Sequence, residues 1–420
     1  MRFPIFLAVL LAGLSGGSVE GAEINPYGPA PAPGSPQALE RAAMFGTPGA
    51  EAAIQLWLDA NPAAPAELRR LLYHRLCELF GVRSWHALRA RACQAGQALS
   101  SEHRTGDDDA GMAGALTETL PIRATGSATI ALETNFLGSR SGPVTVNGVT
   151  LDWFIDTGAE VSVLPQSNAD RLGVRYVGSG INVGTTTADV VGRVGVIDVL
   201  RIGDAIVQSV PVLVLPDERL SLALGPDGPR RMIPGILSLP VFAAFGRMAW
   251  LDGGARLALG EDAPRIRPAS APIYWHDDGL GVPFATARGL FGAHFDSGAT
   301  HSYLYREGGA LLRPAVRAAA IRREVHTAGA GGTIAEQLEE LPRFVATIGG
   351  ARVTLGRVPI QESQEKVARF GDDVIRRLRL LVFDFARMRM SAVPLGAARR
   401  GPHRRADDFK RMALAQRRRM

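Results

Sequence analysis

The chain has 420 residues, enough for two or three domains of ordinary size. Apolar residues make up 46% of it, and Gly (48) and Pro (27) are abundant, a composition that suits a turn-rich β protein better than a helical bundle. The formal net charge of +6 would suit a nucleic-acid-binding protein, but residues 396–420 alone hold nine basic and two acidic residues, so the remainder is close to neutral and no nucleic-acid partner is expected.

The N-terminus has the pattern of a secretory signal peptide over residues 1–22. Arg2 precedes an apolar run from Phe3 to Leu14, and small residues follow. The run is too short to span a membrane. No other stretch is long and apolar enough to do so, and no transmembrane span is expected. The pattern therefore predicts an exported protein, either periplasmic or secreted.

A helical N-terminal domain is expected over residues 23–99, where apolar residues recur at spacings of three and four. Cys77 and Cys93 are the two cysteines of the chain. In an exported protein such a pair is typical of one disulfide, here between neighbouring helices, with two buried free thiols as the alternative. Residues 100–121 are polar and small, which is typical of a linker.

From Ile122 the pattern changes to short alternating apolar runs separated by glycine, which predicts β-strands. Asn147-Gly148 is a favourable hairpin turn between two such runs, and residues 345–355 form a second hairpin. Residues 396–420 are predicted to be a basic disordered tail, with contact to an anionic surface or to nucleic acid as the alternative.

One segment of the β region is duplicated. Residues 154–164 recur 140 positions later as residues 294–304. The repeated cores are Asp156-Thr157-Gly158-Ala159 and Asp296-Ser297-Gly298-Ala299. Each follows an apolar strand and is followed by Ser and Leu at matched positions. A lone Asp in a Gly turn is typically a residue that caps its own backbone. Two in matched context predict a pair of carboxylates, brought together by a two-fold axis, that share a proton and hold one water.

The duplication resembles the aspartic peptidases, in the single-chain, two-lobed form of the pepsin type. The Asp turns are closer to those of the retropepsins. The resemblance is to the bacterial members of this family. The resemblance covers about residues 122–395. It implies a mainly β protein with the two-lobed aspartic-protease β-barrel fold and a small N-terminal α-helical domain. The first lobe would occupy residues 122–262 and the second lobe residues 263–395.

The resemblance also implies roles for the repeated residues. Asp156 and Asp296 would activate the water. The active-site support would come from Thr157 and Ser297, which tie the two turns together, and from Gly158 and Gly298, which let backbone N–H groups approach the carboxylates. The substrate would be a polypeptide in the cleft between the lobes. Neither a metal nor an organic cofactor would be needed, and the chain would act as a monomer.

Ala159 and Ala299 stand where pepsin-like enzymes commonly carry Ser or Thr, whose hydroxyl stabilises an ionised carboxylate. Without these donors, the pair is expected to hold its proton to higher pH. A flap over the cleft is expected at residues 178–187, with an ordinary surface hairpin as the alternative. Residues 329–332 would form the equivalent turn of the second lobe.

Two further features follow from the resemblance. Each Asp turn should be braced by an apolar-apolar-Gly element, and the candidates are Ile233-Pro234-Gly235 and Arg369-Phe370-Gly371. His294 is expected to pack or to line the site, and His301 to face the edge of the cleft or solvent. Neither histidine is interpreted as catalytic.

Several interpretations stay open. The leading function is an exported aspartic endopeptidase. The alternatives are a catalytically inactive peptide-binding relative and an envelope scaffold protein. Residues 23–99 would be either a propeptide removed by cleavage in the linker or a permanent accessory domain.

Overall fold

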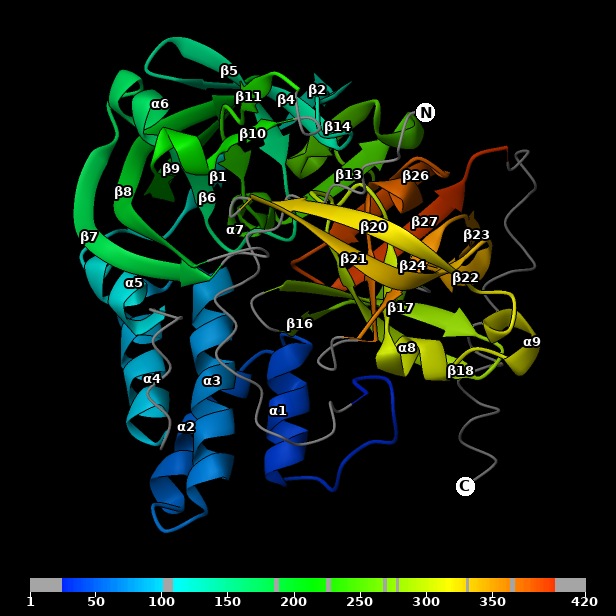
Figure 1. The fold of residues 1–420 in the computed structure, drawn as a ribbon. Coiled ribbons are helices and arrows are strands. Elements are labelled where there is room, and N and C mark those ends of the chain that lie inside the picture. Colours follow the sequence, from blue (N-terminus) through cyan, green and yellow to red (C-terminus); the bar gives the residue numbers. More distant parts are fainter. Residues whose placement is uncertain are drawn as a thin grey trace.

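The structure, a computed structural model, describes residues 25–100, 109–184, 189–223, 228–266, 270–276, 279–329, 332–362 and 367–396. The predicted signal peptide and nearly all of the basic tail lie outside these ranges. The described chain is mainly β, with two lobes and a group of N-terminal helices beneath them (Figure 1). The expected fold class is confirmed.

The first lobe follows the N-terminal helices. Its elements are β1 (Arg123–Thr125), β2 (Ala128–Ala131), β3 (Glu133–Thr134), β4 (Arg140–Val146), β5 (Val149–Ile155), β6 (Ser162–Pro165), α6 (Gln166–Arg171), β7 (Arg175–Gly184), β8 (Asp189–Ile202), β9 (Ala205–Leu215), η1 (Asp217–Arg219), β10 (Ser221–Ala223), β11 (Arg230–Met232), β12 (Ile236–Leu237), α7 (Leu239–Ala244), β13 (Arg247–Leu251), η2 (Asp252–Gly254), β14 (Arg256–Leu259) and η3 (Gly260–Asp262). A nine-stranded sheet in the order β1-β9-β6-β12-β5-β4-β8-β7, with β3 beside β4, forms its core. The predicted Asn147-Gly148 turn joins β4 and β5. Asn147 there has a φ of 48°, the left-handed conformation that this turn requires.

The second lobe repeats this plan. Its elements are β15 (Ala271–Pro272), β16 (Tyr274–His276), β17 (Gly279–Thr286), β18 (Gly289–Phe295), β19 (Tyr303–Tyr305), α8 (Arg306–Ala310), α9 (Pro314–Arg317), β20 (Ile321–Gly329), β21 (Gly332–Leu341), β22 (Phe344–Ile348), β23 (Ala351–Leu355), β24 (Val358–Gln361), β25 (Ala368–Phe370), α10 (Asp372–Ile375), β26 (Leu378–Asp384) and β27 (Arg389–Pro394). A ten-stranded sheet in the order β20-β21-β24-β19-β25-β18-β17-β22-β23, with β16 beside β17, forms its core. The hairpin predicted over residues 345–355 is β22–β23.

One short strand of each lobe lies between the strand that precedes the Asp turn and the strand that follows it. β12 lies parallel to β5 and antiparallel to β6, and β25 lies parallel to β18 and antiparallel to β19. A six-stranded sheet, β15-β27-β26-β13-β14-β2, then joins the lobes. Its central pair consists of β13, from the end of the first lobe, and β26, from the end of the second lobe. Trp250 of β13 packs on Phe295, with ring centroids 5.7 Å apart, so this sheet supports the strand that leads to Asp296.

A buried ion pair also joins the lobes. Arg140 of β4 donates from Nε to Asp372 Oδ1 of α10 (3.1 Å) and from Nη2 to the Gly253 carbonyl (2.8 Å). Arg376 pairs with the same carboxylate and donates to the Gly138 carbonyl of the first lobe. Burial raises the pKa of Asp372, although the two guanidinium groups act in the opposite direction. Two cations on one buried carboxylate therefore link the lobes close to the Asp turns.

The N-terminal domain consists of helices that pack under both lobes (Figure 1). They are α1 (Pro36–Met44), α2 (Ala50–Ala60), α3 (Ala66–Val82), α4 (His86–Ala98) and α5 (Asp109–Ala115). Buried Arg75 of α3 pairs with Glu40 of α1 (3.1 Å) and with Glu78 (2.6 Å). A disulfide between Cys77 and Cys93 joins α3 to α4. Apolar side chains of these helices form one continuous cluster with the cores of both lobes.

Part of the segment predicted as a linker is folded. Residues 101–108 lie outside the described ranges, but α5 follows them. Met112 and Ala113 in α5 and Leu116 directly after it are buried. These side chains form an apolar face, which is not evident from the average composition of residues 100–121 because most of that segment is polar and small. An ideal Cβ at Gly178 of β7 would come within 2.7 Å of Ala115 Cβ, so α5 packs directly on this strand. No helix in the described part of the chain is long and apolar enough to cross a membrane.

The disulfide yields a stability prediction. It closes a loop with a sequence separation of 16 residues, and a loop of this length restrains the unfolded chain by about 3 kcal/mol. Replacing Cys77 and Cys93 by Ser should lower the free energy of local unfolding of α3 and α4 by about that amount. Hydrogen–deuterium exchange of the α3 and α4 amides measures it. Wild-type protein kept reduced should match the double variant, and unchanged exchange in both would contradict the prediction.

Candidate active site

The two Asp turns, residues 156–159 and 296–299, meet where the lobes face each other. Asp156 follows β5 and Asp296 follows β18, and their side chains are 1% and 0% exposed. Asp156 N–H donates to the Leu237 carbonyl (3.0 Å), and Asp296 N–H donates to the Phe370 carbonyl (2.9 Å). The two Asp residues therefore have equivalent backbone hydrogen bonds and equivalent positions in their lobes.

Thr157 and Ser297 join the two turns through reciprocal hydrogen bonds. Thr157 N–H donates to Ser297 Oγ, and Ser297 N–H donates to Thr157 Oγ1, both at 3.0 Å. Thr157 Oγ1 donates to the Phe295 carbonyl (3.1 Å), and Ser297 Oγ donates to the Ile155 carbonyl (2.8 Å). Each buried hydroxyl is thus fully satisfied by backbone of the opposite lobe, which holds the turns in one relative position.

The glycines allow the carboxylates to come close. An ideal Cβ at Gly158 would lie 2.5 Å from Asp296 Cγ, and one at Gly298 would lie 2.4 Å from Asp156 Cγ. Each carboxylate therefore rests on the glycine of the opposite lobe. Asp156 Oδ1 accepts the Gly158 N–H (2.8 Å), whereas Asp296 Oδ1 accepts the Gly298 and Ala299 N–H groups (2.9 and 3.0 Å). The structure brings all six predicted site residues together.

The second oxygen of each carboxylate remains available. Oδ2 of Asp156 and Oδ2 of Asp296 are buried and have no hydrogen-bond partner among the described residues. Burial and the neighbouring Asp296 carboxylate raise the pKa of Asp156 well above its ordinary value, against the opposing effects of the Gly158 N–H and Arg369. Two carboxyl groups this close titrate as one unit and share a proton. Such a pair, called the dyad below, can act on one water as base and acid.

The brace of each turn is a backbone N–H bound to the Ser that follows the turn. In the second lobe Gly371 N–H donates to Ser302 Oγ (3.1 Å), as the resemblance implies for Arg369-Phe370-Gly371. In the first lobe the equivalent donor is Ser238 N–H, which donates to Ser162 Oγ (3.2 Å).

The first-lobe brace is therefore Ile236-Leu237-Ser238, and the prediction of Ile233-Pro234-Gly235 was wrong. Gly235 serves another purpose, because an ideal Cβ there would come within 2.7 Å of the Trp153 ring. The apolar pair Ile236-Leu237 was the better sequence signal, since a Ser can donate the same backbone N–H as a Gly.

Two long hairpins leave the edges of the lobes. β7–β8 contains the predicted flap at residues 178–187, and β20–β21 contains its predicted second-lobe counterpart at residues 329–332. In Figure 1 the described ends of both hairpins point toward the middle of the molecule. The tips at residues 185–188 and 330–331 lie outside the described ranges, so their function as flaps stays a prediction.

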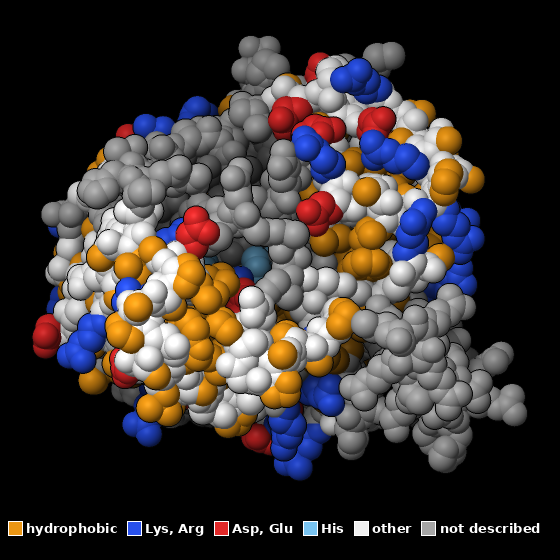
Figure 2. Space-filling view, turned by 90° about the horizontal axis from the view of Figure 1, so that it is seen from below, with side chains coloured by type: hydrophobic (Ala, Val, Ile, Leu, Met, Phe, Trp, Pro, Cys, Tyr) orange, Lys and Arg blue, Asp and Glu red, His pale blue; other side chains and the backbone are white. Residues whose placement is uncertain are grey.

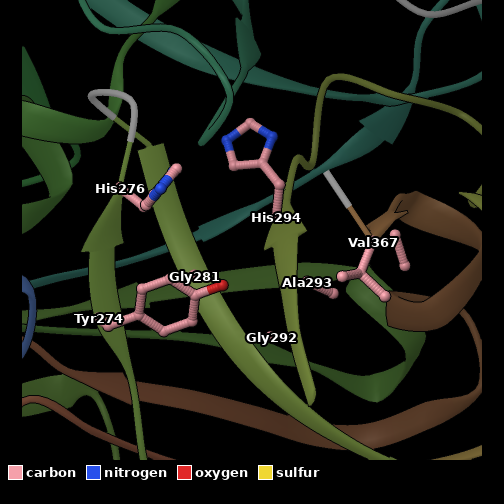
Figure 3. Close-up of a pocket in the computed structure, with 8 residues that line it drawn as sticks. Tyr274, His276, Gly281, Gly292, Ala293, His294 and Val367 are labelled. Carbon is pink, nitrogen blue, oxygen red and sulfur yellow. The ribbon is translucent and has the colours of Figure 1, made fainter. Parts of the chain in front are cut away.

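A small pocket adjoins the strand that leads to Asp296 (Figure 3). His294 of β18 and His276 of β16 point into it, and the Tyr274 ring lies below them. Gly279 makes room for the His294 ring, because an ideal Cβ there would lie 2.2 Å from Nε2. His294 is 9% exposed and lines this pocket, as expected. The surface seen from the helical side is also hollowed near its centre, where a histidine side chain is visible (Figure 2).

His301 lies beside the second Asp turn and is partly buried. Its Nδ1 hydrogen-bonds to Thr300 Oγ1 (2.9 Å). Burial, together with Arg376 and Arg357, lowers the pKa of His301 to about 4. The ring is therefore neutral at weakly acidic and neutral pH. Within the described ranges, no group of three or more His, Cys, Asp or Glu side chains is placed to hold a metal ion.

Sequence reasoning missed the most unusual neighbour of Asp296. Arg369 of β25 places Nη1 3.7 Å from Asp296 Oδ2. The sequence shows this residue only as a charged departure from the apolar brace pattern. Its position, two residues before Gly371, was the available signal, because that position faces the strand that carries Asp296.

Comparison with known proteins gives one family match. Residues 142–241 match the sequence model of a family described as aspartyl protease. This range contains the first Asp turn and the Ile236-Leu237 brace strand, and the match supports a peptidase. A similar solved structure is that of Basic 7S globulin from soybean, at 11% identity and a TM-score of 0.42, covering 65% of this chain and 95% of that chain. No curated protein matches the sequence.

The contact between the turns yields a prediction at Gly298. The Gly298→Ala variant would place a methyl group 2.4 Å from Asp156 Cγ, and should therefore push the two carboxylates apart. A displacement of about 1 Å in such a site costs roughly 100-fold in rate. Peptide-cleavage rate measures the loss. Gly114→Ala is the matched control, because an ideal Cβ at Gly114 meets nothing within 4 Å. Equal activity of both variants would contradict the geometry.

Proposed function

We propose that this protein is an exported aspartic endopeptidase that hydrolyses peptide bonds with a water held between Asp156 and Asp296. The observation that carries the proposal is the reciprocal geometry of the two turns. Each carboxylate is buried against the glycine of the opposite lobe, and its Oδ2 has no hydrogen-bond partner among the described residues. The aspartyl protease match over residues 142–241 supports the same chemistry.

The reaction needs one proton on the dyad. The ionised carboxylate takes a proton from the water, and the water oxygen bonds to the carbonyl carbon of the substrate. The protonated carboxyl gives its proton to the carbonyl oxygen, which forms a neutral tetrahedral diol. Proton transfer from the dyad to the amide nitrogen then lets the C–N bond break, while a diol hydroxyl returns a proton to the other carboxylate. The dyad ends with the single proton with which it began.

The first lobe surrounds its Asp turn with buried apolar side chains. Phe154, Ala159, Val163 and Ile236 belong to one buried apolar cluster. Because one chain supplies both carboxylates, a monomer is sufficient for the reaction.

Export is proposed from the signal-peptide pattern of residues 1–22, and the disulfide between Cys77 and Cys93 fits an oxidising compartment such as the periplasm or the exterior. The helical domain is proposed to stay attached to the enzyme. Its helices share a core with both lobes. Arg89 of α4 also lies 3.8 Å from Glu160, four residues after Asp156, and both side chains are buried. Removal as a propeptide is the alternative.

Substitution of either Asp tests the function. Asp156→Asn and Asp296→Asn each remove an acid or a base, so cleavage of a peptide library should fall by roughly 10²- to 10⁴-fold while circular dichroism stays unchanged. Asp204→Asn, at an exposed turn between β8 and β9, is the control and should keep full activity. Undiminished cleavage by either site variant would rule out the mechanism, and a folded wild-type protein that cleaves nothing would favour the inactive peptide-binding relative.

The pH profile should reflect the missing hydroxyl donors at Ala159 and Ala299. The pKa of Asp156 is raised, so its proton is held to higher pH and activity should decline only as the pH rises through that value. We expect a weakly acidic optimum for the rate of peptide cleavage. Serine at both positions would stabilise the ionised dyad and should move the acid limb to lower pH. A strongly acidic optimum in the wild type would contradict this expectation.

A further inference from the structure

The two halves of the site match in backbone but differ in the side chains beside the dyad. Strand register fixes three pairs of equivalent positions. The pairs are Phe154 and His294, Val163 and Tyr303, and Ile236 and Arg369. The first-lobe members are apolar and lie in one apolar cluster. The second-lobe members are polar or charged, so the environment of Asp296 differs from that of Asp156.

Arg369 is the charged member of this set. It lies on β25 between β18 and β19, and it is 9% exposed. Its Nη1 lies 3.7 Å from Asp296 Oδ2, and its Nε has no hydrogen-bond partner among the described residues. An arginine keeps its charge at every pH at which the protein would work. A cation buried to this extent needs a nearby anion.

The dyad supplies that anion. The carboxylates that act on Arg369 are those of Asp296 and, more weakly, Asp156. The other titratable groups facing it are Tyr303 and Tyr305 from β19, with His294 on the neighbouring strand. Burial raises the pKa of Tyr303, so its phenol is neutral. Asp373 faces Tyr303 and accepts a hydrogen bond from Ser302 Oγ (2.6 Å), and burial raises the pKa of Asp373 to about 6.

We propose that Arg369 is a positioning residue of the dyad, whose guanidinium keeps the single negative charge on Asp296 so that Asp156 carries the shared proton. This inference rests on the proposed function and assigns its two roles. Asp296 accepts the proton of the attacking water, and Asp156 donates its proton to the oxygen of the substrate carbonyl. In the first lobe the equivalent position holds Ile236, so it supplies no cation to Asp156.

The assignment agrees with the surroundings of Asp156. Its Oδ1 accepts one backbone N–H, whereas Asp296 Oδ1 accepts two. More donors favour the ionised form of a carboxyl group. The backbone and Arg369 therefore act in the same direction, and the raised pKa of Asp156 is consistent with both.

The pH dependence of kcat/KM tests the proposal with two variants. Arg369→Met keeps the side-chain bulk and removes the charge, so both limbs of the profile should move to higher pH by about 1 unit or more. Arg369→Lys keeps a cation and should restore the limbs toward the wild-type positions. If Arg369→Met lowers kcat/KM but leaves both limbs of the pH profile in place, Arg369 has only a structural role and the proposal fails. A rise in KM confined to substrates with Asp or Glu side chains would show that Arg369 binds substrate instead.

A titration without substrate separates this proposal from the proposed function. Carbon-13 NMR of Asp carboxyl groups in the wild-type protein, assigned with Asp156→Asn and Asp296→Asn, should show that the proton of the singly protonated dyad lies on Asp156. A proton on Asp296 would overturn the proposal, whether or not Arg369→Met folds. If the proton lies on Asp156 but no peptide is cleaved, the charge assignment stands and the peptidase function fails.

Discussion

The crossed hydrogen bonds between Thr157 and Ser297 hold the lobes at the separation where each Asp rests on the glycine of the other lobe. This contact leaves no room for a side chain at Gly158 or Gly298. It also buries both carboxylates beside each other, which favours retention of a proton between them. The shared proton of Asp156 and Asp296 therefore depends on how closely the two Asp turns approach each other.

The remaining architecture keeps that approach in place. The six-stranded sheet pairs β13 with β26 across the lobes, and the pair between Arg140 and Asp372 ties the first lobe to the helix that follows the second brace. The N-terminal helices pack against both lobes from one side. Each of these contacts restrains the relative position of the lobes, on which the short distances between the turns depend.

A near-symmetric backbone surrounds a dyad whose two members must do opposite things. The strands, turns and serine braces repeat in both lobes, so they cannot decide which Asp is acid and which is base. Side chains that differ between the lobes can decide it. Arg369 occupies the position equivalent to Ile236, and this pair differs in charge. Tyr303 replaces the equivalent Val163, and His294 replaces the equivalent Phe154, so the second-lobe side is more polar.

The sequence predicts the Asp turns well because each is a local motif. A strand that ends in Asp and runs into a Gly turn can be recognised from a few residues, and so can the Asn147-Gly148 hairpin. The brace at Ser238 could not be placed this way, since its register is set by pairing with β5 and β6 and not by a glycine. Helix α5 was not recognised within a polar segment, because its apolar residues become buried only when they pack against α4 and the first lobe. In the sequence, Arg369 is only a charged residue in the expected apolar-apolar-Gly brace. Its relation to the site depends on its distance to Asp296, which the sequence does not show.

The central claim is that Oδ2 of Asp156 and Oδ2 of Asp296 act on one water. The most direct test is a crystal structure with a peptide whose scissile bond is replaced by a hydroxyl-bearing tetrahedral carbon, built on the sequence that the enzyme cleaves best in a library. The account predicts that this hydroxyl lies within about 3 Å of Oδ2 of both Asp156 and Asp296. A hydroxyl that contacts only one carboxylate, or a peptide bound away from the two turns, would contradict it.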